Sequence, residues 1–210
     1  MTQYTHIVFD IDGTMLDSAF ADLSALQRVI RELQNRECPL EELQFALGIP
    51  GHVALKQLGI EEVETANRLW NKYMTELSHT MRLFDGIVET IRTLKSHGLK
   101  IGIVTSKNPI EYAHDFSPFG IDALFDTVIL VTDSKAPKPS PEPMFAYLEK
   151  SNASPEEVLY IGDTRYDRNC AAGAGVDFGL ALWGARSPHE IEATYQFHSP
   201  HDIIQTVLSI

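Results

Sequence analysis

Residues 7–14 read IVFDIDGT, a run of three apolar residues followed by two aspartates around a single isoleucine. A short, continuous apolar run is typical of a strand that is buried on both faces of a parallel sheet. Asp10 then ends the strand, Asp12 projects one alternation further, and Gly13 permits a tight turn. Turn chemistry alone explains one of these acids, but not both. The stretch therefore predicts a buried first strand with a pair of carboxylates at its carboxyl end.

Similar short apolar runs recur along the chain with helical segments between them. The expected strands are Lys100–Val104, Val128–Val131, Val158–Ile161 and Gly179–Trp183. The expected helices are Ile87–Ser96, Ile110–Phe116, Pro141–Lys150 and Asp167–Ala174. Because strands alternate with helices, we expect right-handed crossovers and an α/β fold, with a parallel, Rossmann-like sheet in a three-layer core.

The region from about Ala19 to Leu83 breaks this alternation, because it contains no convincing strand and reads as helices only. Apolar residues recur at helical spacing in a first helix (Leu23, Leu26, Ile30, Leu33), in short helices over Leu40–Leu47 and Val53–Leu58, and in a longer last one (Val63, Leu69, Trp70, Tyr73, Met74, Leu77). We therefore expect a core domain of residues 1–16 and 84–210 and an inserted all-helical cap domain of residues 17–83. Ligands of open α/β sheets bind beyond the carboxyl ends of the strands, where such an insertion would act as a lid.

Composition excludes several classes of partner. The 210 residues include 29 Asp and Glu against 17 Lys and Arg, a formal net charge of -12 that repels nucleic-acid backbones and anionic membranes. No window of about eighteen apolar residues predicts a membrane span, and the start of the chain leaves no room for a secretory signal. We therefore expect a cytoplasmic protein without nucleic-acid or membrane partners. Cys38 and Cys170 have no nearby partner in the sequence and are expected to be reduced packing thiols.

A second pair of acids follows a later strand, in GDTRYD at residues 162–167. Asp163 is expected at the strand end and Asp167 near the start of the next helix, where helix capping alone would account for it. Carboxylates that converge on one edge of the sheet repel one another unless a cation joins them. Oxygen-only ligands suit Mg²⁺. Metal-bound phosphoryl chemistry is therefore the leading hypothesis for this edge.

Two further segments provide groups that suit an anion. Thr105 and Ser106 end the strand Lys100–Val104, so their hydroxyls and backbone N–H groups are candidates for an anion cradle. Lys138 lies in KAPKPSP, residues 135–141, a proline-stiffened loop that would direct its ammonium inward. Taken alone, a threonine at a strand end is usually a helix cap, and a single lysine is usually a solvated surface charge.

The order of these segments, DIDGT, TS, KPSP and GDTRYD, resembles that of the haloacid dehalogenase (HAD) superfamily. The chain looks like the phosphoglycolate phosphatase-type members, in which a helical cap lies between the first two motifs. The likeness covers essentially the whole length, including FDG at residues 84–86 and LWG at residues 182–184. It implies a phosphoric monoester hydrolase that acts on a small phosphorylated metabolite, as a monomer or a dimer.

The resemblance also implies roles for individual residues. Asp10 would be the nucleophile that forms an aspartyl-phosphate, and Asp12 the general acid and base. Lys138 would neutralise the developing charge and hold Asp10 in position. The transferring phosphoryl group would be bound by Gly13, Thr105 and Ser106. Mg²⁺ would be bound by Asp10, the backbone carbonyl of Asp12 and Asp163, while Asp167 would ligate through water or orient Asp163.

The substrate is expected to be selected by the cap. The turn Gly48–His52, followed by Lys56, is the candidate segment facing the site, with His52 as the candidate substrate contact. Because His52 and Lys56 are four residues apart, they could equally lie on an exposed helix face.

Several other functions remain open or are disfavoured. A sugar-phosphate mutase of β-phosphoglucomutase type resembles the chain around Thr105–Asn108, but that family tends to carry two adjacent acids where this chain has Asp163 and Asp167. A pyrophosphatase of the same superfamily is also possible. A dehalogenase would leave Asp12 and Asp163 unexplained. A non-catalytic receiver module would carry its acceptor aspartate on a middle strand and lack the helical insertion, and a degenerate binding protein would be expected to lack the acids present here.

Overall fold

The computed structural model describes residues 4–47 and 49–208, and it confirms the expected α/β class. The chain divides into two compact units, of which the first combines Met1–Asp17 with Leu83–Ile210 and the second is Ser18–Arg82. The first unit contains a six-stranded sheet whose strands pair in parallel. Within the described residues, none of the helices has the length and apolar character needed to cross a membrane.

The order of strands places the first strand in the middle of the sheet. Across the sheet the strands are β5 (Thr127–Ile129), β4 (Lys100–Val104), β1 (His6–Phe9), β6 (Val158–Gly162), β7 (Asp177–Ala181) and β8 (Tyr195–Phe197). Phe9 of β1 is opposite Ile103 of β4 and Ile161 of β6. The chain adds β4 and β5 on one side of β1 and then β6 to β8 on the other. The topological switch point, where open α/β sheets bind ligands, therefore lies between β1 and β6.

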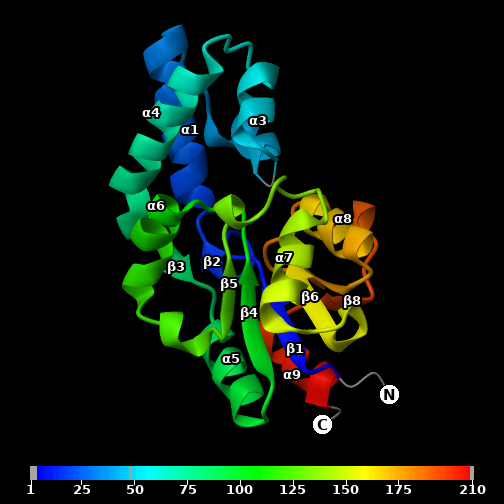
Figure 1. Cartoon of the computed structure of the whole chain (residues 1–210). Coiled ribbons are helices and arrows are strands. Elements are labelled where there is room, and N and C mark those ends of the chain that lie inside the picture. Colours follow the sequence, from blue (N-terminus) through cyan, green and yellow to red (C-terminus); the bar gives the residue numbers. More distant parts are fainter. Residues whose placement is uncertain (1–3, 48, 209–210) are drawn as a thin grey trace. The chain divides into compact units, whose positions relative to one another are not determined.

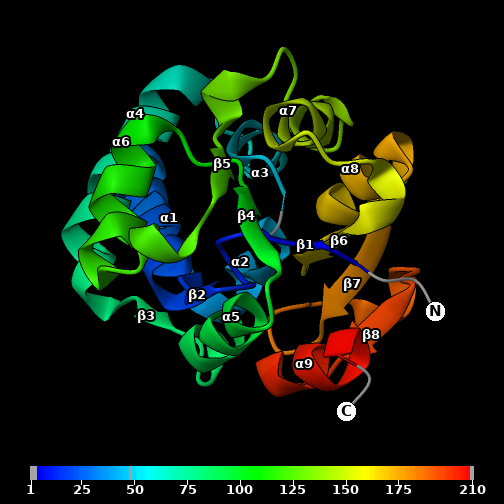
Figure 2. The same cartoon turned by 60° about the horizontal axis from the view of Figure 1, so that its bottom comes forward.

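Helices cover both faces of this sheet. Helices α7 (Glu142–Ser151) and α8 (Arg165–Ala174) pack together on one face, and α5 (Ile87–Ser96) and α9 (Pro200–Leu208) pack together on the other (Figures 1 and 2). Each helix buries its apolar side, as expected of an amphipathic helix against a sheet. The core between the sheet and the first pair of helices includes Val8, Tyr160, Met144, Tyr147 and Cys170.

Short elements connect these layers. A brief helix α6 (Pro109–Glu111) continues as a π-helical turn over Tyr112–Phe116. Single 3₁₀ turns cover Ser117–Phe119, Asp122–Leu124, Val131–Asp133, Pro155–Glu157 and Pro188–Glu190. Two further strands, β2 (Leu16–Asp17) and β3 (Arg82–Leu83), form a separate two-stranded sheet.

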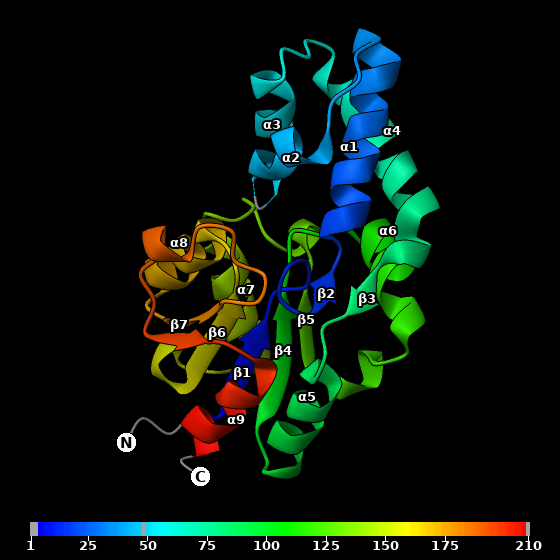
Figure 3. The ribbon, with the colours of Figure 1, turned by 180° about the vertical axis from the view of Figure 1, so that it is seen from behind.

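The second unit is helical. Its helices are α1 (Ala19–Gln34), α2 (Leu40–Leu43), α3 (Gly51–Gln57) and α4 (Val63–Leu77), with 3₁₀ turns at Gln44–Ala46 and Ser78–Thr80. Helices α1 and α4 lie side by side (Figure 3), and the indole N–H of Trp70 donates to the carbonyl of Asp22 at 3.2 Å. Leu23, Leu26 and Ile30 are buried as their spacing predicts. Leu33 was expected on the same face but is 37% exposed, because it lies in the last turn, where the helix ends.

The structure corrects several expected boundaries. β5 ends at Ile129 rather than Val131, because Val131–Asp133 turn back and the Asp133 carboxylate accepts a hydrogen bond from the Leu130 N–H. β7 begins at Asp177 and ends at Ala181, since Leu182 and Trp183 already leave the sheet in a turn. α8 begins at Arg165, two residues before the expected start.

Other elements were missed. β8 was not anticipated, because a three-residue edge strand is too short to show a pattern. The helix that follows it, α9, was missed as well. The helical region also ends in a strand at Arg82–Leu83, so the expectation of helices only was wrong there.

Both cysteines, Cys38 and Cys170, are buried and free, as expected of packing thiols.

The close packing of α7 on the sheet depends on Gly102 in β4. A Cβ atom at this position would lie 2.2 Å from the ring of Tyr147, which is fully buried. We expect Gly102→Ala to lower the free energy of unfolding by about 1–3 kcal/mol, because neither the sheet nor the ring has room to move. Urea unfolding monitored by circular dichroism measures the change. Ile110→Ala, at an exposed site, is the control, and an unchanged urea midpoint for Gly102→Ala would contradict this account of the packing.

Candidate active site

Asp10 lies at the carboxyl end of β1, at the switch point of the sheet. Its N–H continues the ladder by donating to the carbonyl of Ile161 at 2.9 Å, which fixes the backbone from which the side chain projects. The carboxylate is buried, and its Oδ1 lies 2.9 Å from the Nζ of Lys138. Burial raises the pKa of Asp10 to about 7, and the Lys138 ammonium opposes that rise.

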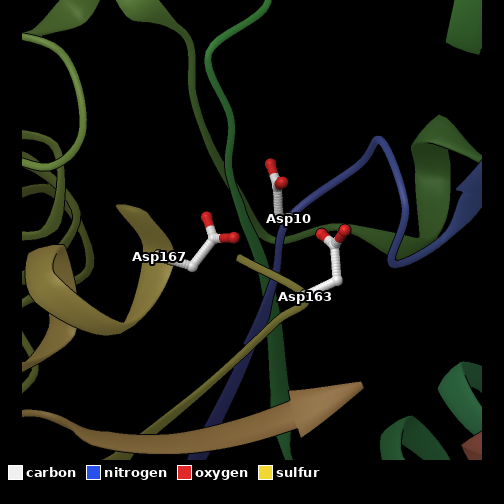
Figure 4. Close-up of side chains that lie close together, drawn as sticks. All are labelled: Asp10, Asp163 and Asp167. Atoms are coloured by element: carbon white, nitrogen blue, oxygen red, sulfur yellow. The ribbon is translucent and has the colours of Figure 1, made fainter. Parts of the chain in front are cut away.

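Two further carboxylates approach Asp10 from the neighbouring strand and helix. Asp163 follows β6 directly, and its Oδ1 accepts a hydrogen bond from the Thr14 hydroxyl at 3.2 Å. Asp167 is the third residue of α8 and is fully buried. One oxygen from each of Asp10, Asp163 and Asp167 lies within 4.8 Å of the others, and Figure 4 shows the three side chains directed toward a common space.

Asp167 is held by a helix cap. Its carboxylate and Thr164 form a reciprocal capping box, in which Oδ2 accepts from the Thr164 N–H at 3.0 Å and from its hydroxyl at 2.5 Å. The other oxygen, Oδ1, lies 2.5 Å from the Nζ of Lys138. Burial pushes the pKa of Asp167 upward, but Lys138 and these hydrogen bonds outweigh it and hold the pKa below its usual value. Both of its oxygens are thus engaged with the protein.

Lys138 reaches this group from the loop before α7, where the sequence placed it. Its ammonium is buried between Asp10 and Asp167, and these carboxylates raise the pKa of Lys138 against the opposing effect of burial. The Tyr160 hydroxyl lies 3.2 Å from Nζ and 2.9 Å from the Val104 carbonyl, so it links Lys138 to the end of β4. No local pattern marks Tyr160 as a site residue, because it lies within the apolar run of β6 like any core aromatic.

The loop after β1 requires glycine at position 13. Gly13 has a φ of +76°, and a Cβ atom there would lie 2.1 Å from Oδ2 of Asp163. Its N–H donates to the carbonyl of Leu16 at 2.9 Å, so it is used within the loop, and a contact with phosphate stays a prediction. The indole N–H of Trp183 donates to the carbonyl of Thr14 at 2.9 Å, so the LWG segment holds the other side of this loop.

The charge of this group of side chains fits a divalent cation. Three buried carboxylates and the single ammonium of Lys138 leave a formal charge of -2. Burial, and then the neighbouring charges of Asp167 and Asp10, raise the pKa of Asp163 well above its usual value. Oxygen-only donors of this kind match the preference of Mg²⁺. Asp10, Asp163 and Asp167 are therefore suited to hold a hard divalent cation.

The Asp12 carboxylate is not part of this group and has different neighbours. Its Oδ2 lies 3.1 Å from the Nζ of Lys107, and the same Nζ lies 2.8 Å from Oδ2 of Asp115. Lys107 and Asp115 are both buried, and the two carboxylates raise the pKa of Lys107 despite its burial. Sequence reasoning missed both residues. The one available signal was that Lys107 is two residues from Thr105.

Thr105 and Ser106 follow β4, next to β1 in the sheet. Thr105 is buried, and its Oγ1 accepts a hydrogen bond from the Lys107 N–H at 3.3 Å. Ser106 is exposed. The helix expected from Ile110 starts one residue earlier, at Pro109, and Asn108 caps it. Their contact with a phosphoryl group stays a prediction.

The candidate substrate-binding turn lies in the helical unit. His52 and Lys56 are on α3, and both side chains are exposed. Gly48, at the start of the turn, lies outside the described residues. A contact between His52 and a substrate therefore stays a prediction.

The sequence is similar to those of known pyrophosphatases over most of its length. A pyrophosphatase PpaX of Halalkalibacterium halodurans is 26% identical over 207 residues, which cover 96% of this chain and 95% of that protein. A PpaX of Bacillus mycoides is 28% identical over 89% of this chain and 87% of its own length.

The chain is also similar to solved structures of hydrolases. A candidate phosphoglycolate phosphatase of Lactobacillus plantarum is 28% identical with a TM-score of 0.90, over 97% of this chain and 99% of that one. A HAD-superfamily hydrolase of Geobacter sulfurreducens is 27% identical with a TM-score of 0.77, over 98% and 97% of the two chains. The model of the haloacid dehalogenase-like hydrolases matches residues 7–181, from β1 to the end of β7. The chain therefore belongs to the haloacid dehalogenase-like hydrolase family.

Proposed function

We propose that this protein is a Mg²⁺-dependent phosphatase that hydrolyses a small phosphate monoester through an aspartyl-phosphate on Asp10. The observation that carries the proposal is the environment of Asp10, a buried carboxylate 2.9 Å from the Lys138 ammonium and grouped with Asp163 and Asp167. Attack by a carboxylate on a phosphate dianion brings like charges together. The Lys138 ammonium and a cation held by the carboxylates would supply the positive charge that offsets this repulsion.

In the first step, a carboxylate oxygen of Asp10 attacks phosphorus and the bond from phosphorus to the ester oxygen breaks. The departing oxygen takes the proton of the Asp12 carboxyl group. The Lys138 ammonium offsets the charge on the transferring phosphoryl group, and the Thr105 hydroxyl, which follows the neighbouring strand β4, would donate a hydrogen bond to it.

In the second step, the Asp12 carboxylate takes a proton from water, and the water oxygen forms the new bond to phosphorus. The bond between phosphorus and the Asp10 oxygen breaks, which releases inorganic phosphate and restores both carboxyl groups. The side chains of Asp10, Asp163 and Asp167 and the backbone carbonyl of Asp12 would hold Mg²⁺, which supplies charge neutralisation when bound. Since both oxygens of Asp167 are already engaged, a contact through water suits that residue best.

Pyrophosphate is the second candidate substrate. It is supported by the curated relatives PpaX, which are named pyrophosphatases, whereas the similar structure from Lactobacillus plantarum supports a phosphoglycolate-like ester. Both reactions use the same attack on phosphorus and differ in the leaving group.

A substrate panel separates these candidates. With Mg²⁺ present, we expect rapid phosphate release from phosphoglycolate and slower release from pyrophosphate, measured as initial rates of inorganic phosphate formation. A higher kcat/KM for pyrophosphate would replace the monoester assignment by the second candidate. Isomerisation of β-glucose 1-phosphate without phosphate release would indicate a mutase instead.

Removal of the nucleophile tests the central role of Asp10. We expect Asp10→Asn to remain folded and to lower turnover by at least about 10³-fold, because an amide oxygen cannot form the phosphorylated intermediate. Steady-state kinetics and mass spectrometry of the trapped phosphoenzyme measure the effect. Asp85→Asn, at an exposed aspartate of the same unit, is the matched control. Undiminished turnover in Asp10→Asn would refute the mechanism.

Metal binding should appear in thermal stability as well as in activity. A Mg²⁺ concentration about 100 times Kd stabilises a protein by about 2.7 kcal/mol, which for this size raises Tm by about 5–10 °C. We expect Asp163→Asn to abolish this gain. Without metal at neutral pH, we expect the variant to unfold at the wild-type temperature or above it. Burial raises the pKa of Asp163, so its ionised form destabilises the folded state. An equal Mg²⁺-dependent gain in the variant would contradict the assigned ligands.

A further inference from the structure

Lys107 is a buried lysine outside the group of carboxylates around Lys138. Only 7% of its side chain is exposed, and a lysine is rarely buried to this extent unless it is paired. Its Nζ lies between two carboxylates, 2.8 Å from Asp115 and 3.1 Å from Asp12. Burying a lysine is costly unless its charge is paired, and here two carboxylates pair it.

Asp115 forms the fixed end of this arrangement. Its side chain is 5% exposed, and it lies in the π-helical turn Tyr112–Phe116. The next residue, Phe116, is fully buried and packs against the ring of Phe125 with centroids 5.9 Å apart. The start of the segment is held by the Asn108 cap on α6. Asp115 is therefore anchored at both ends of its segment and can hold the Lys107 ammonium in place.

Asp12 forms the accessible end. Its side chain is 40% exposed, in contrast to the two buried partners behind it. The positive charge of Lys107 and the negative charge of Asp115 cancel formally, so the pair presents N–H donors to Asp12 without adding a net charge. The Lys107 N–H also donates to Thr105 Oγ1 at 3.3 Å, which ties this pair to the end of β4.

We propose that Lys107, held by Asp115, is a positioning residue that directs the Asp12 carboxyl group at the leaving-group oxygen of the substrate. The inference rests on the proposed function, since it assigns Lys107 to the proton-transfer half of that reaction. The two buried lysines then have separate tasks. Lys138 serves the nucleophile Asp10, and Lys107 serves the acid and base Asp12.

The leaving group provides a test, because only a poor leaving group needs the proton of Asp12 as its bond to phosphorus breaks. An alkyl ester such as phosphoglycolate leaves as an alkoxide and needs it, whereas p-nitrophenyl phosphate leaves as a stable phenolate. The value of kcat/KM reports the steps up to departure of the leaving group. We expect Lys107→Met to lower kcat/KM by at least about 100-fold for phosphoglycolate and by less than about threefold for p-nitrophenyl phosphate.

Further variants separate positioning from folding. Asp115→Asn, which retains the shape of the anchor, should give the same selective loss and serves if Lys107→Met does not fold. Adding Lys107→Met to Asp12→Asn should cause no further loss on phosphoglycolate. Lys95→Met removes the lysine of the partly exposed Lys95–Asp126 ion pair in the same unit and should leave both substrates unaffected.

Equal losses on the two substrates, or an additional loss in the double variant, would overturn the role of Lys107. These outcomes are distinct from failure of the proposed function. Phosphate release by the wild-type enzyme that disappears in Asp10→Asn supports that function on its own, whatever Lys107→Met does. Persistence of turnover in Asp10→Asn would instead overturn both, because Asp12 would then have no phosphorylated Asp10 to serve.

Discussion

Repulsion among buried carboxylates is the constraint on which this site depends. Asp10, Asp163 and Asp167 come within 4.8 Å of one another at the switch point of the sheet, where little water can screen them. Lys138 offsets one negative charge, while burial and the neighbouring carboxylates raise the pKa values of Asp10 and Asp163. The folded protein thus carries an electrostatic cost that a bound divalent cation would relieve. Buried carboxylates with displaced pKa values are common at functional sites.

The parallel register explains why these groups meet. β1 pairs with β4 on one side and β6 on the other, with Phe9 opposite both Ile103 and Ile161. The residues that follow the three strands therefore emerge at one edge, although the first and last of them, Asp10 and Asp163, are more than 150 positions apart in the sequence. A helix start and a proline-rich loop add Asp167 and Lys138 at the same edge.

The sequence was sufficient to predict the acids at the strand ends, because an apolar run that stops at aspartate is a local signal. Lys138 could be identified from its place in the order of motifs. Lys107, Asp115 and Tyr160 could not, since their roles depend on contacts across the fold that no local pattern records. The same limit applies to β8, which is defined by its pairing with β7 rather than by its own three residues.

The cap of α8 links local unfolding of the helix to the group of buried carboxylates, because Asp167 belongs to both. The Asp167 carboxylate accepts the N–H of the N-cap residue Thr164 and also belongs to the buried carboxylates, so fraying of the first turn would withdraw Asp167 from Lys138. We therefore expect the start of this helix and the site to open and close as one cooperative unit. Amide hydrogen exchange at Thr164 and Asp167, whose N–H groups form the cap, therefore reports on the integrity of the site without a substrate.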